Sequence, residues 1–253
     1  MNRLFALRNR AARIAAVVGV LLAAPAAAHA AEGPSSAAVP PRIELTQADV
    51  DSSNAKVRMA FSELVSLWAG EFKQLNTSFE TPRLARYRSA VRTGCGVMAP
   101  SNAAYCLNDN TVYFDDIFVA AQAKIAGHAL GTDGDMAAVG IIAHEVGHAV
   151  AMQLGFRSRD SYRNESVADC LAGAFAHHAQ TMGQLEKGDI DEAFYGMASA
   201  GDPDLTGDAR TDRRLRAVVA REAHGTREQR TANFRAGLEH GAGACMGELQ
   251  GAA

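Results

Sequence analysis

The sequence predicts a mainly helical α+β domain with a small antiparallel sheet. Apolar residues recur at helical spacing over several stretches, and two short segments with strand character flank a pair of cysteines. Close to half of the 253 residues are apolar and few are aromatic, which is typical of a globular domain. Because no internal repeat or later linker interrupts the pattern, residues 43–253 are predicted to form one domain.

The first thirty residues have the composition of an export signal. Four arginines, the last at Arg13, precede an apolar run from Ile14 to Ala24, and the small-residue sequence Ala28-His29-Ala30 follows. The run is short of the roughly 20 residues that a membrane-spanning helix needs. Residues 1–30 are therefore interpreted as a cleaved signal peptide, and the Pro- and Ser-rich residues 31–42 as a flexible leader. The protein is expected to be exported, periplasmic or secreted, without a stable membrane anchor after cleavage.

The charge of the remaining chain is negative. Residues 31–253 contain 21 Lys and Arg against 28 Asp and Glu, a formal charge of −7. This balance argues against nucleic acid or an anionic membrane as a partner.

The elements are predicted from periodicity, beginning at the amino end. Apolar residues from Val57 to Leu75 recur at helical spacing, so residues 54–75 are expected to form a long amphipathic helix. Stretches with strand character on either side of the Cys95 to Cys106 segment predict an antiparallel pair. The second of them, residues 112–115, is considered as an edge strand for an extended peptide, although most such strands belong to the core.

Five helical patterns follow, over residues 115–126, 135–154, 164–180, 188–200 and 210–222. For the second pattern, Asp133 and Asp135 favour the helix start, and Gly155 favours its end. The acidic stretch at residues 186–193 is expected to be a solvated helix start, with Asp189 or Asp191 as its cap.

The four cysteines are expected to be paired, because an exported chain meets an oxidising compartment. Four cysteines allow three pairings. Cys95 and Cys106 flank a short segment that could close as a local loop, which would leave Cys170 to pair with Cys245. Neither spacing resembles a cysteine-rich zinc finger.

The stretch GIIAHEVGHAVAMQLG, residues 140–155, places two histidines where they can share one metal ion. On a helix, His144 and His148 lie one turn apart and project from the same face. Glu145, one step round the helix, can contact a water on that ion without being a ligand. A catalytic zinc site keeps three protein ligands and one open position, so the sequence must supply a third ligand.

The stretch NESVADC, residues 164–170, offers that third ligand. Glu165 is the predicted ligand, and Asp169, one turn further on the same face, is predicted to accept the second imidazole proton of a ligand histidine. The reverse assignment, with Asp169 as the ligand, stays as the alternative. A third histidine in the pattern HExxHxxGxxH is excluded because Ala151 and Leu154 occupy the required positions. Two histidines on an apolar helix are often core residues, and the second motif is what favours a metal site.

Four blocks of the chain, AHEVGHAVAMQLG, ESVADCLAGAF, GDIDEA and HGTREQRTANFRAG, resemble the neutral zinc metallopeptidase family of bacteria. The upstream residues TGCG, YC and VYFD resemble the family's cysteine loop and strand. The resemblance runs from about Cys95 to Cys245 with the blocks in the same order. Two segments depart from the family pattern: SNAAYCLND in the cysteine loop, and Ala149 to Ala151 after the HExxH motif. Neither change removes a proposed ligand, but the first predicts a different substrate preference if that loop lines the cleft.

The resemblance implies a zincin-like metallopeptidase fold over residues 43–253 and one Zn²⁺. Its implied ligands are His144, His148 and Glu165. Glu145 is implied as the general base and proton shuttle. The resemblance also implies the disulfides Cys95–Cys106 and Cys170–Cys245.

The predicted function is an exported zinc peptidase that cleaves a peptide or protein substrate, with an endopeptidase as the expected type. Zn²⁺ would polarise the scissile carbonyl while Glu145 moves a proton from water to the leaving amine. His224 is the candidate donor to the oxyanion, and Arg230 is a weaker one. Their competing roles are a helix cap for His224 and an ion pair with a nearby acid for Arg230.

Two other classes of protein compete with the peptidase. One is a zinc-containing pseudo-peptidase that acts as a protein-binding module. The other is a helical exported protein whose histidines fill a core without metal.

Overall fold

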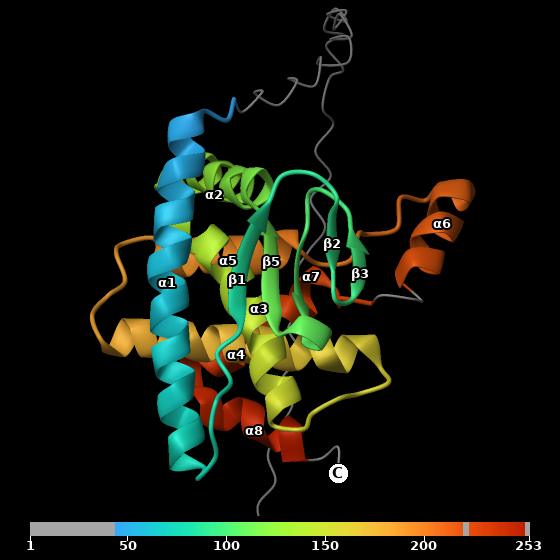
Figure 1. The fold of residues 1–253 in the computed structure, drawn as a ribbon. Coiled ribbons are helices and arrows are strands. Elements are labelled where there is room, and N and C mark those ends of the chain that lie inside the picture. Colours follow the sequence, from blue (N-terminus) through green and yellow to red (C-terminus); the bar gives the residue numbers. More distant parts are fainter. Residues whose placement is uncertain (1–43, 220–222, 251–253) are drawn as a thin grey trace, which may run out of the picture. The chain divides into compact units, whose positions relative to one another are not determined.

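The computed structural model describes residues 44–219 and 223–250 of the chain, so the predicted signal peptide and leader lie outside the described residues (Figure 1). The described part is mostly helical with two small sheets, and the α+β prediction is confirmed. No helix in this part is both long and apolar enough to cross a bilayer.

The larger sheet has three strands in the order β1 (Arg83–Tyr87), β5 (Thr111–Asp115) and β4 (Ala103–Cys106). β5 pairs with β1 in parallel and with β4 in antiparallel fashion. The smaller sheet is the antiparallel hairpin of β2 (Val91–Thr93) and β3 (Gly96–Met98).

The prediction of an antiparallel pair across the cysteine segment was therefore wrong for β1 and β5. β4 runs opposite to both strands, so the chain between β1 and β5 changes direction before β4 and again after it, and β5 regains the direction of β1. Residues 112–115 also lie at the centre of the sheet and not at its edge, and Val112 and Phe114 are buried. The edge strands of this sheet are β1 and β4.

α1 (Gln47–Gln74) begins seven residues before the predicted start. Thr46 and Asp49 form a capping box, in which each side chain bonds to the other residue's backbone N–H and satisfies donors that the first turn leaves free. The predicted apolar stripe is the buried face, with Val57, Leu64 and Trp68 in the core. Figure 1 shows α1 as a long helix beside the sheet.

The five helical patterns that follow are confirmed, with shifted ends, except that the predicted end of the fifth at residues 220–222 lies outside the described residues. They correspond to α2 (Asp116–Leu130), α3 (Asp135–Gln153), α4 (Ser161–Thr181), α5 (Asp189–Ser199) and α6 (Ala209–Val219). Gly155 follows the end of α3 with a φ of +83°, as predicted for a helix terminator.

Two helices were not predicted: α7 (Arg227–His240) and α8 (Ala242–Gln250). The buried residues of α7 are Arg230, Phe234 and Gly237, so its inner face has no apolar periodicity that a sequence pattern could reveal.

The predicted cap of α5 was wrong, while Asp135 lies in the first turn of α3, at the helix start that it was expected to favour. The N-cap residues are Gly134 and Gly188, and neither has a side chain that could cap. The carboxylate of Glu192, which is fully buried, accepts hydrogen bonds from the backbone N–H of Gly134 at 3.0 Å and of Met136 at 2.9 Å. Asp189 and Glu192 of the acidic start of α5 are thus buried, while Asp191 is exposed. Glu192 supplies the amino end of α3 with the negative charge that a helix start favours.

α4 and α7 pack with their backbones in contact through two glycines. A Cβ at Gly173 would lie 2.0 Å from the carbonyl oxygen of Phe234, and a Cβ at Gly237 would lie 1.9 Å from that of Cys170. No side chain fits at either position, so the two helices approach as closely as backbones allow.

Both disulfides have the predicted pairing, and all four cysteines are used. Cys95–Cys106 ties the residues between β2 and β3 to the end of β4. Cys170–Cys245 ties α8 to α4.

Candidate metal centre

α3 and α4 bring His144, His148 and Glu165 together in one cluster, and one ligand atom from each lies within 4.8 Å of the others. The two Nε2 atoms are 3.1 Å apart. Oε2 of Glu165 lies 3.1 Å from Nε2 of His144, and Oε1 lies 3.4 Å from Nε2 of His148. The spacing of four along α3 puts both imidazoles on one face, and α4 crosses opposite that face.

The cluster fits a cation better than it fits a hydrogen-bond network. Oε2 of Glu165 is buried and accepts no hydrogen bond, although Nε2 of His144 is near it. Buried carboxylate oxygens are normally paired. Two imidazole nitrogens and a carboxylate form the donor set of a three-ligand zinc site with an open fourth position.

The electrostatics of the cluster favour positive charge. Burial lowers the pKa of the His144 imidazole, but the carboxylates of Asp169 and Glu165 outweigh burial and raise that pKa to about 10. Burial raises the pKa of Glu165, and the close contact and positive charge of His144 and His148 more than reverse this, leaving that pKa well below its usual range. The cluster therefore holds an ionised carboxylate in a buried place where a metal ion can displace protons.

Asp169 lies behind His144, on the side away from the cluster. Its Oδ1 is 2.9 Å from Nδ1 of His144, the nitrogen opposite the one that faces Glu165. This is the contact predicted for a carboxylate that fixes the tautomer of a ligand histidine. Asp169 is completely buried and is not a member of the ligand cluster.

Arg230 of α7 has the ion pair that was its competing role. Its Nη2 donates to Oδ1 of Asp169 at 2.6 Å and its Nε donates to Oδ2 at 3.1 Å, while Nη1 donates to the carbonyl of Ala200 at 3.0 Å. Only 4% of the Arg230 side chain is exposed. All three guanidinium nitrogens donate hydrogen bonds, so Arg230 links α7 to α4 and to the end of α5. These bonds are called the brace below.

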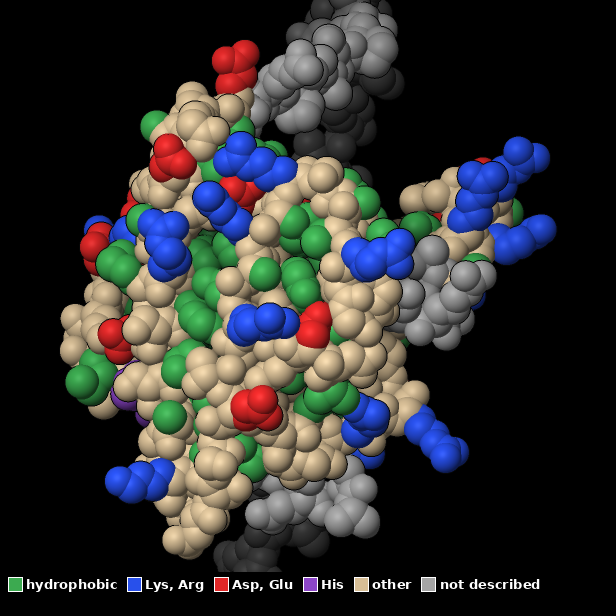
Figure 2. Space-filling model, in the orientation of Figure 1, with side chains coloured by type: hydrophobic (Ala, Val, Ile, Leu, Met, Phe, Trp, Pro, Cys, Tyr) green, Lys and Arg blue, Asp and Glu red, His purple; other side chains and the backbone are tan. Residues whose placement is uncertain are grey.

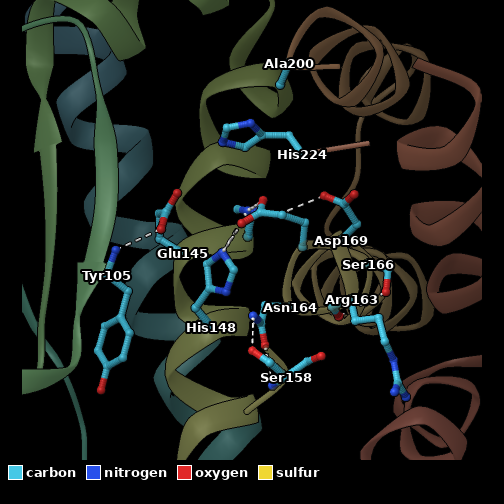
Figure 3. A network of polar contacts seen from close by, with 12 residues as sticks. Tyr105, Glu145, His148, Ser158, Arg163, Asn164, Ser166, Asp169, Ala200 and His224 are labelled. Carbon is cyan, nitrogen blue, oxygen red and sulfur yellow. Dashed lines mark hydrogen bonds and ion pairs between the residues drawn. The ribbon is translucent and has the colours of Figure 1, made fainter. Parts of the chain in front are cut away.

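Glu145 lies beside the cluster and bonds to the sheet. Its Oε2 accepts a hydrogen bond of 2.8 Å from the backbone N–H of Tyr105 in β4 (Figure 3). The Tyr105 N–H therefore points away from β5 and toward α3. The sequence carried no signal for this contact, because it uses a backbone group forty residues away.

A groove of about 560 Å³ opens over the cluster. One wall is formed by Asn102 and by residues 103–105 of β4. The end of α5 also lines the groove, through Gly196, Met197, Ser199 and Ala200. Ile141 and Ala137 continue the floor along α3 from His144 toward its amino end, where Phe118 and Met197 add apolar surface. Figure 2 shows the face of the molecule on which the sheet lies.

His224 lines the same groove, with about half of its side chain exposed. Its backbone N–H donates to Oδ1 of Asp202 at 3.2 Å, and its Nδ1 lies 3.6 Å from the same oxygen. It does not cap α7, whose N-cap is Thr226. Figure 3 shows the ring of His224 near the end of α5 at Ala200.

Comparison with known proteins finds a matching family and several relatives. Residues 11–247 match the sequence model of the family described as "Putative neutral zinc metallopeptidase". The uncharacterized protein YpfJ of Escherichia coli strain K12 is 35% identical over 193 residues, which cover 69% of this chain and 63% of that protein. The uncharacterized protein Rv2575 of Mycobacterium tuberculosis strain H37Rv is 30% identical over 152 residues, 52% of this chain and 51% of that protein.

The chain thus spans less than two thirds of the length of these relatives. No solved structure matches the chain. The family match extends over nearly the whole sequence and includes both histidines and the glutamate of the cluster. The chain belongs to the neutral zinc metallopeptidase family.

Proposed function

We propose that this protein is an exported zinc-dependent endopeptidase in which His144, His148 and Glu165 hold the metal. The observation that carries this proposal is the carboxylate of Glu165: each of its two oxygens faces one imidazole nitrogen, and the buried Oε2 accepts no hydrogen bond. The family match supports a zinc peptidase in general. The two disulfides support export to an oxidising compartment, where disulfides persist.

Zinc, when held by these residues, would supply Lewis acidity toward a peptide carbonyl and a water molecule. Glu145 is the group placed to take a proton from that water and to pass it to the leaving amine when the C–N bond breaks. The Tyr105 N–H holds the Glu145 carboxylate at the groove wall. His224 lines the groove and can donate to the oxygen that gains negative charge.

An extended peptide is the substrate that the groove suits. β4 is an edge strand, and its residues line the groove beside Glu145. An edge strand offers free backbone groups to which an added strand can bond. A groove open to solvent along a strand accepts the middle of a chain, which favours an endopeptidase.

The test measures metal and cleavage separately. The purified protein should contain about one zinc per chain by mass spectrometry, and Glu165→Ala should lose most of it, while Glu63→Ala on the exposed face of α1 should keep it. Glu145→Gln should keep zinc and fold and lose hydrolysis of an unfolded protein substrate.

Three results would overturn the proposal. Wild-type protein without zinc after reconstitution would make the cluster a buried core. Equal cleavage by wild type and Glu145→Gln would remove the general base. A third result is that wild type and Glu145→Gln both contain full zinc, both bind the same partner protein, and neither hydrolyses a substrate. The protein would then be a protein-binding module and not a peptidase.

A further inference from the structure

The segment between α5 and α7 leaves the groove and returns to it through a closed neck. The backbone N–H of Asp202 donates to the carbonyl of Gly225 at 2.8 Å, and the N–H of Gly225 donates to Oδ2 of Asp202 at 2.9 Å. The chain between Asp202 and His224 therefore leaves and returns at one point, and residues 203–219 and Ala223 are the described part of this excursion. The neck lies at the rim of the groove, because Ala200 and His224 on either side of it line the groove.

α6 is the helix of this excursion, and Figure 1 shows it standing away from the helices that surround the groove. Its described outer surface is basic. Four exposed arginines lie within seven residues: Arg210, Arg213, Arg214 and Arg216. None of them forms an ion pair with a described residue. Figure 2 shows blue side chains gathered on this projecting part.

Two acidic residues of the excursion, Asp208 and Asp212, accept hydrogen bonds from its backbone, and Asp212 also attracts Arg216. Oδ1 of Asp208 accepts from the N–H of Thr211 at 2.8 Å, and Oδ1 of Asp212 accepts from the N–H of Thr206 at 2.7 Å. The arginines at positions 210 and 213, 210 and 214, and 213 and 216 are like charges three or four residues apart, a spacing that destabilises a helix. α6 thus carries repulsion that an anionic partner would relieve.

We propose that α6 is a docking surface for an acidic, extended polypeptide segment. Arginine suits this partner because its planar fork binds carboxylates in pairs of hydrogen bonds. Charge complementarity is local. Residues 31–253 carry a formal charge of −7, whereas α6 carries four arginines and one aspartate. At physiological salt, charges beyond about 8 Å are screened, so a segment at α6 meets mainly the arginines.

A membrane surface fits α6 less well. A helix that lies in a bilayer interface needs a large apolar face, usually with aromatic residues. Residues 203–219 contain no aromatic residue, and Leu215 of α6 is already half-buried. The basic face is therefore suited to carboxylates in solution.

The neck, where Asp202 and Gly225 meet, connects the docking surface of α6 to the rim of the groove. A chain bound along α6 meets the excursion at the rim where Ala200 and His224 lie, so its neighbouring residues are held near the groove. This inference goes beyond the proposed peptidase function, since binding at α6 does not require a peptide bond to be cleaved.

The experiment measures binding of a fluorescein-labelled decaglutamate peptide by anisotropy at low and at physiological salt. Wild type is compared with Arg213→Glu/Arg214→Glu and with a control of equal charge change, Arg58→Glu/Arg92→Glu, whose arginines are exposed on α1 and β2. We expect the α6 variant to bind about ten-fold more weakly than the control, and we expect added salt to shrink this difference.

Circular dichroism and zinc content check that both variants fold alike. Equal affinity of the α6 variant and the control for decaglutamate overturns the proposal. So does preferential binding of wild type to phosphatidylserine vesicles over decaglutamate, which would make α6 a membrane-contacting helix. Absence of decaglutamate binding by wild type at low salt has the same effect. Because no arm measures hydrolysis, failure here leaves the peptidase proposal standing, and failure of the peptidase leaves this result unchanged.

Discussion

The backbone N–H of Tyr105 and the carboxylate of Glu145 join the edge of the sheet to the helix of the two histidines, at a distance of 2.8 Å. A strand that adds to β4 would compete for this N–H, because it is the kind of group that edge pairing uses. The resting position of Glu145 and the binding of an extended chain therefore depend on the same donor.

Replacement of Tyr105 by proline tests this relationship. Tyr105→Pro removes the N–H, and an edge strand tolerates proline. With the carboxylate of Glu145 no longer held, we expect kcat to fall by about ten-fold or more, since a hydrogen bond to a charged group is worth about 1.5–3 kcal/mol, while zinc content stays unchanged. Tyr105→Ala keeps the N–H and is the control. Equal rates for the two variants would show that the hydrogen bond has no role in turnover.

The buried pair of Asp169 and Arg230 should be costly to break from either side. Asp169→Ala leaves a buried guanidinium without its carboxylate, and we expect a loss of about 3–5 kcal/mol of unfolding free energy. Arg230→Met should cost a similar amount. Urea denaturation of both variants and of the double variant checks this, because a pair gives a double-variant loss well below the sum. Additive losses would contradict the pairing.

Removal of the Glu192 cap should weaken α3. Glu192→Ala leaves the N–H groups of Gly134 and Met136 buried without an acceptor, so we expect a loss of about 3 kcal/mol of unfolding free energy. Asp191→Ala, at the exposed neighbouring position, should change stability by less than about 0.5 kcal/mol. Chemical denaturation measures both. A loss that is no larger for Glu192 than for Asp191 would remove the capping role.

Asp189 should make stability depend on pH in the weakly acidic range. Burial, and then the negative charges of Asp135 and Glu192, raise the pKa of Asp189 to about 6. An acid with a raised pKa binds its proton more tightly in the folded state, so its contribution to stability is greatest below about pH 4 and is lost as pH rises to about 6.

Asp189→Asn should remove this slope. The amide oxygen can still accept from the N–H of Glu186, as Asp189 does at 2.7 Å. We expect the variant to be more stable than wild type by about 2 kcal/mol above pH 6 and equal to it below pH 4. Urea midpoints across this range measure the difference, and parallel curves for the two proteins would refute it.

The two disulfides should contribute unequally. Cys170–Cys245 spans 75 residues and Cys95–Cys106 spans 11, so loop-closure entropy predicts contributions of about 4.5 and about 2.8 kcal/mol. Paired Cys→Ser variants and their urea midpoints measure this order. We also expect loss of Cys170–Cys245 to weaken zinc binding, because Cys170 adjoins Asp169. Unchanged affinity in that variant would mean that α8 does not support the site.

The centre of the site was predictable because its geometry is local. His144 and His148 share a face through helix periodicity alone, and Glu165 and Asp169 repeat that spacing on the next helix. A pattern of four along one helix constrains direction without any knowledge of the fold.

The rest of the site could not be read from the sequence because it depends on tertiary pairing. Glu192 caps a helix 58 residues away, and its acidic neighbourhood has the composition of a solvated start. Arg230 pairs with Asp169 across 61 residues. The direction of β5 depends on how many times the chain turns between strands, which short strands do not reveal.

The backbone contact of α4 and α7 at Gly173 and Gly237 sets the distance between the two helices. With no side chain between them, the distance between the helix axes is fixed by main-chain atoms, and this distance determines how deep Arg230 reaches toward Asp169. Any substitution at either glycine would push α7 outward and lengthen every bond of the brace together. A saturation screen scored by zinc retention should therefore find these two positions as intolerant as the ligands themselves, although neither carries a functional group.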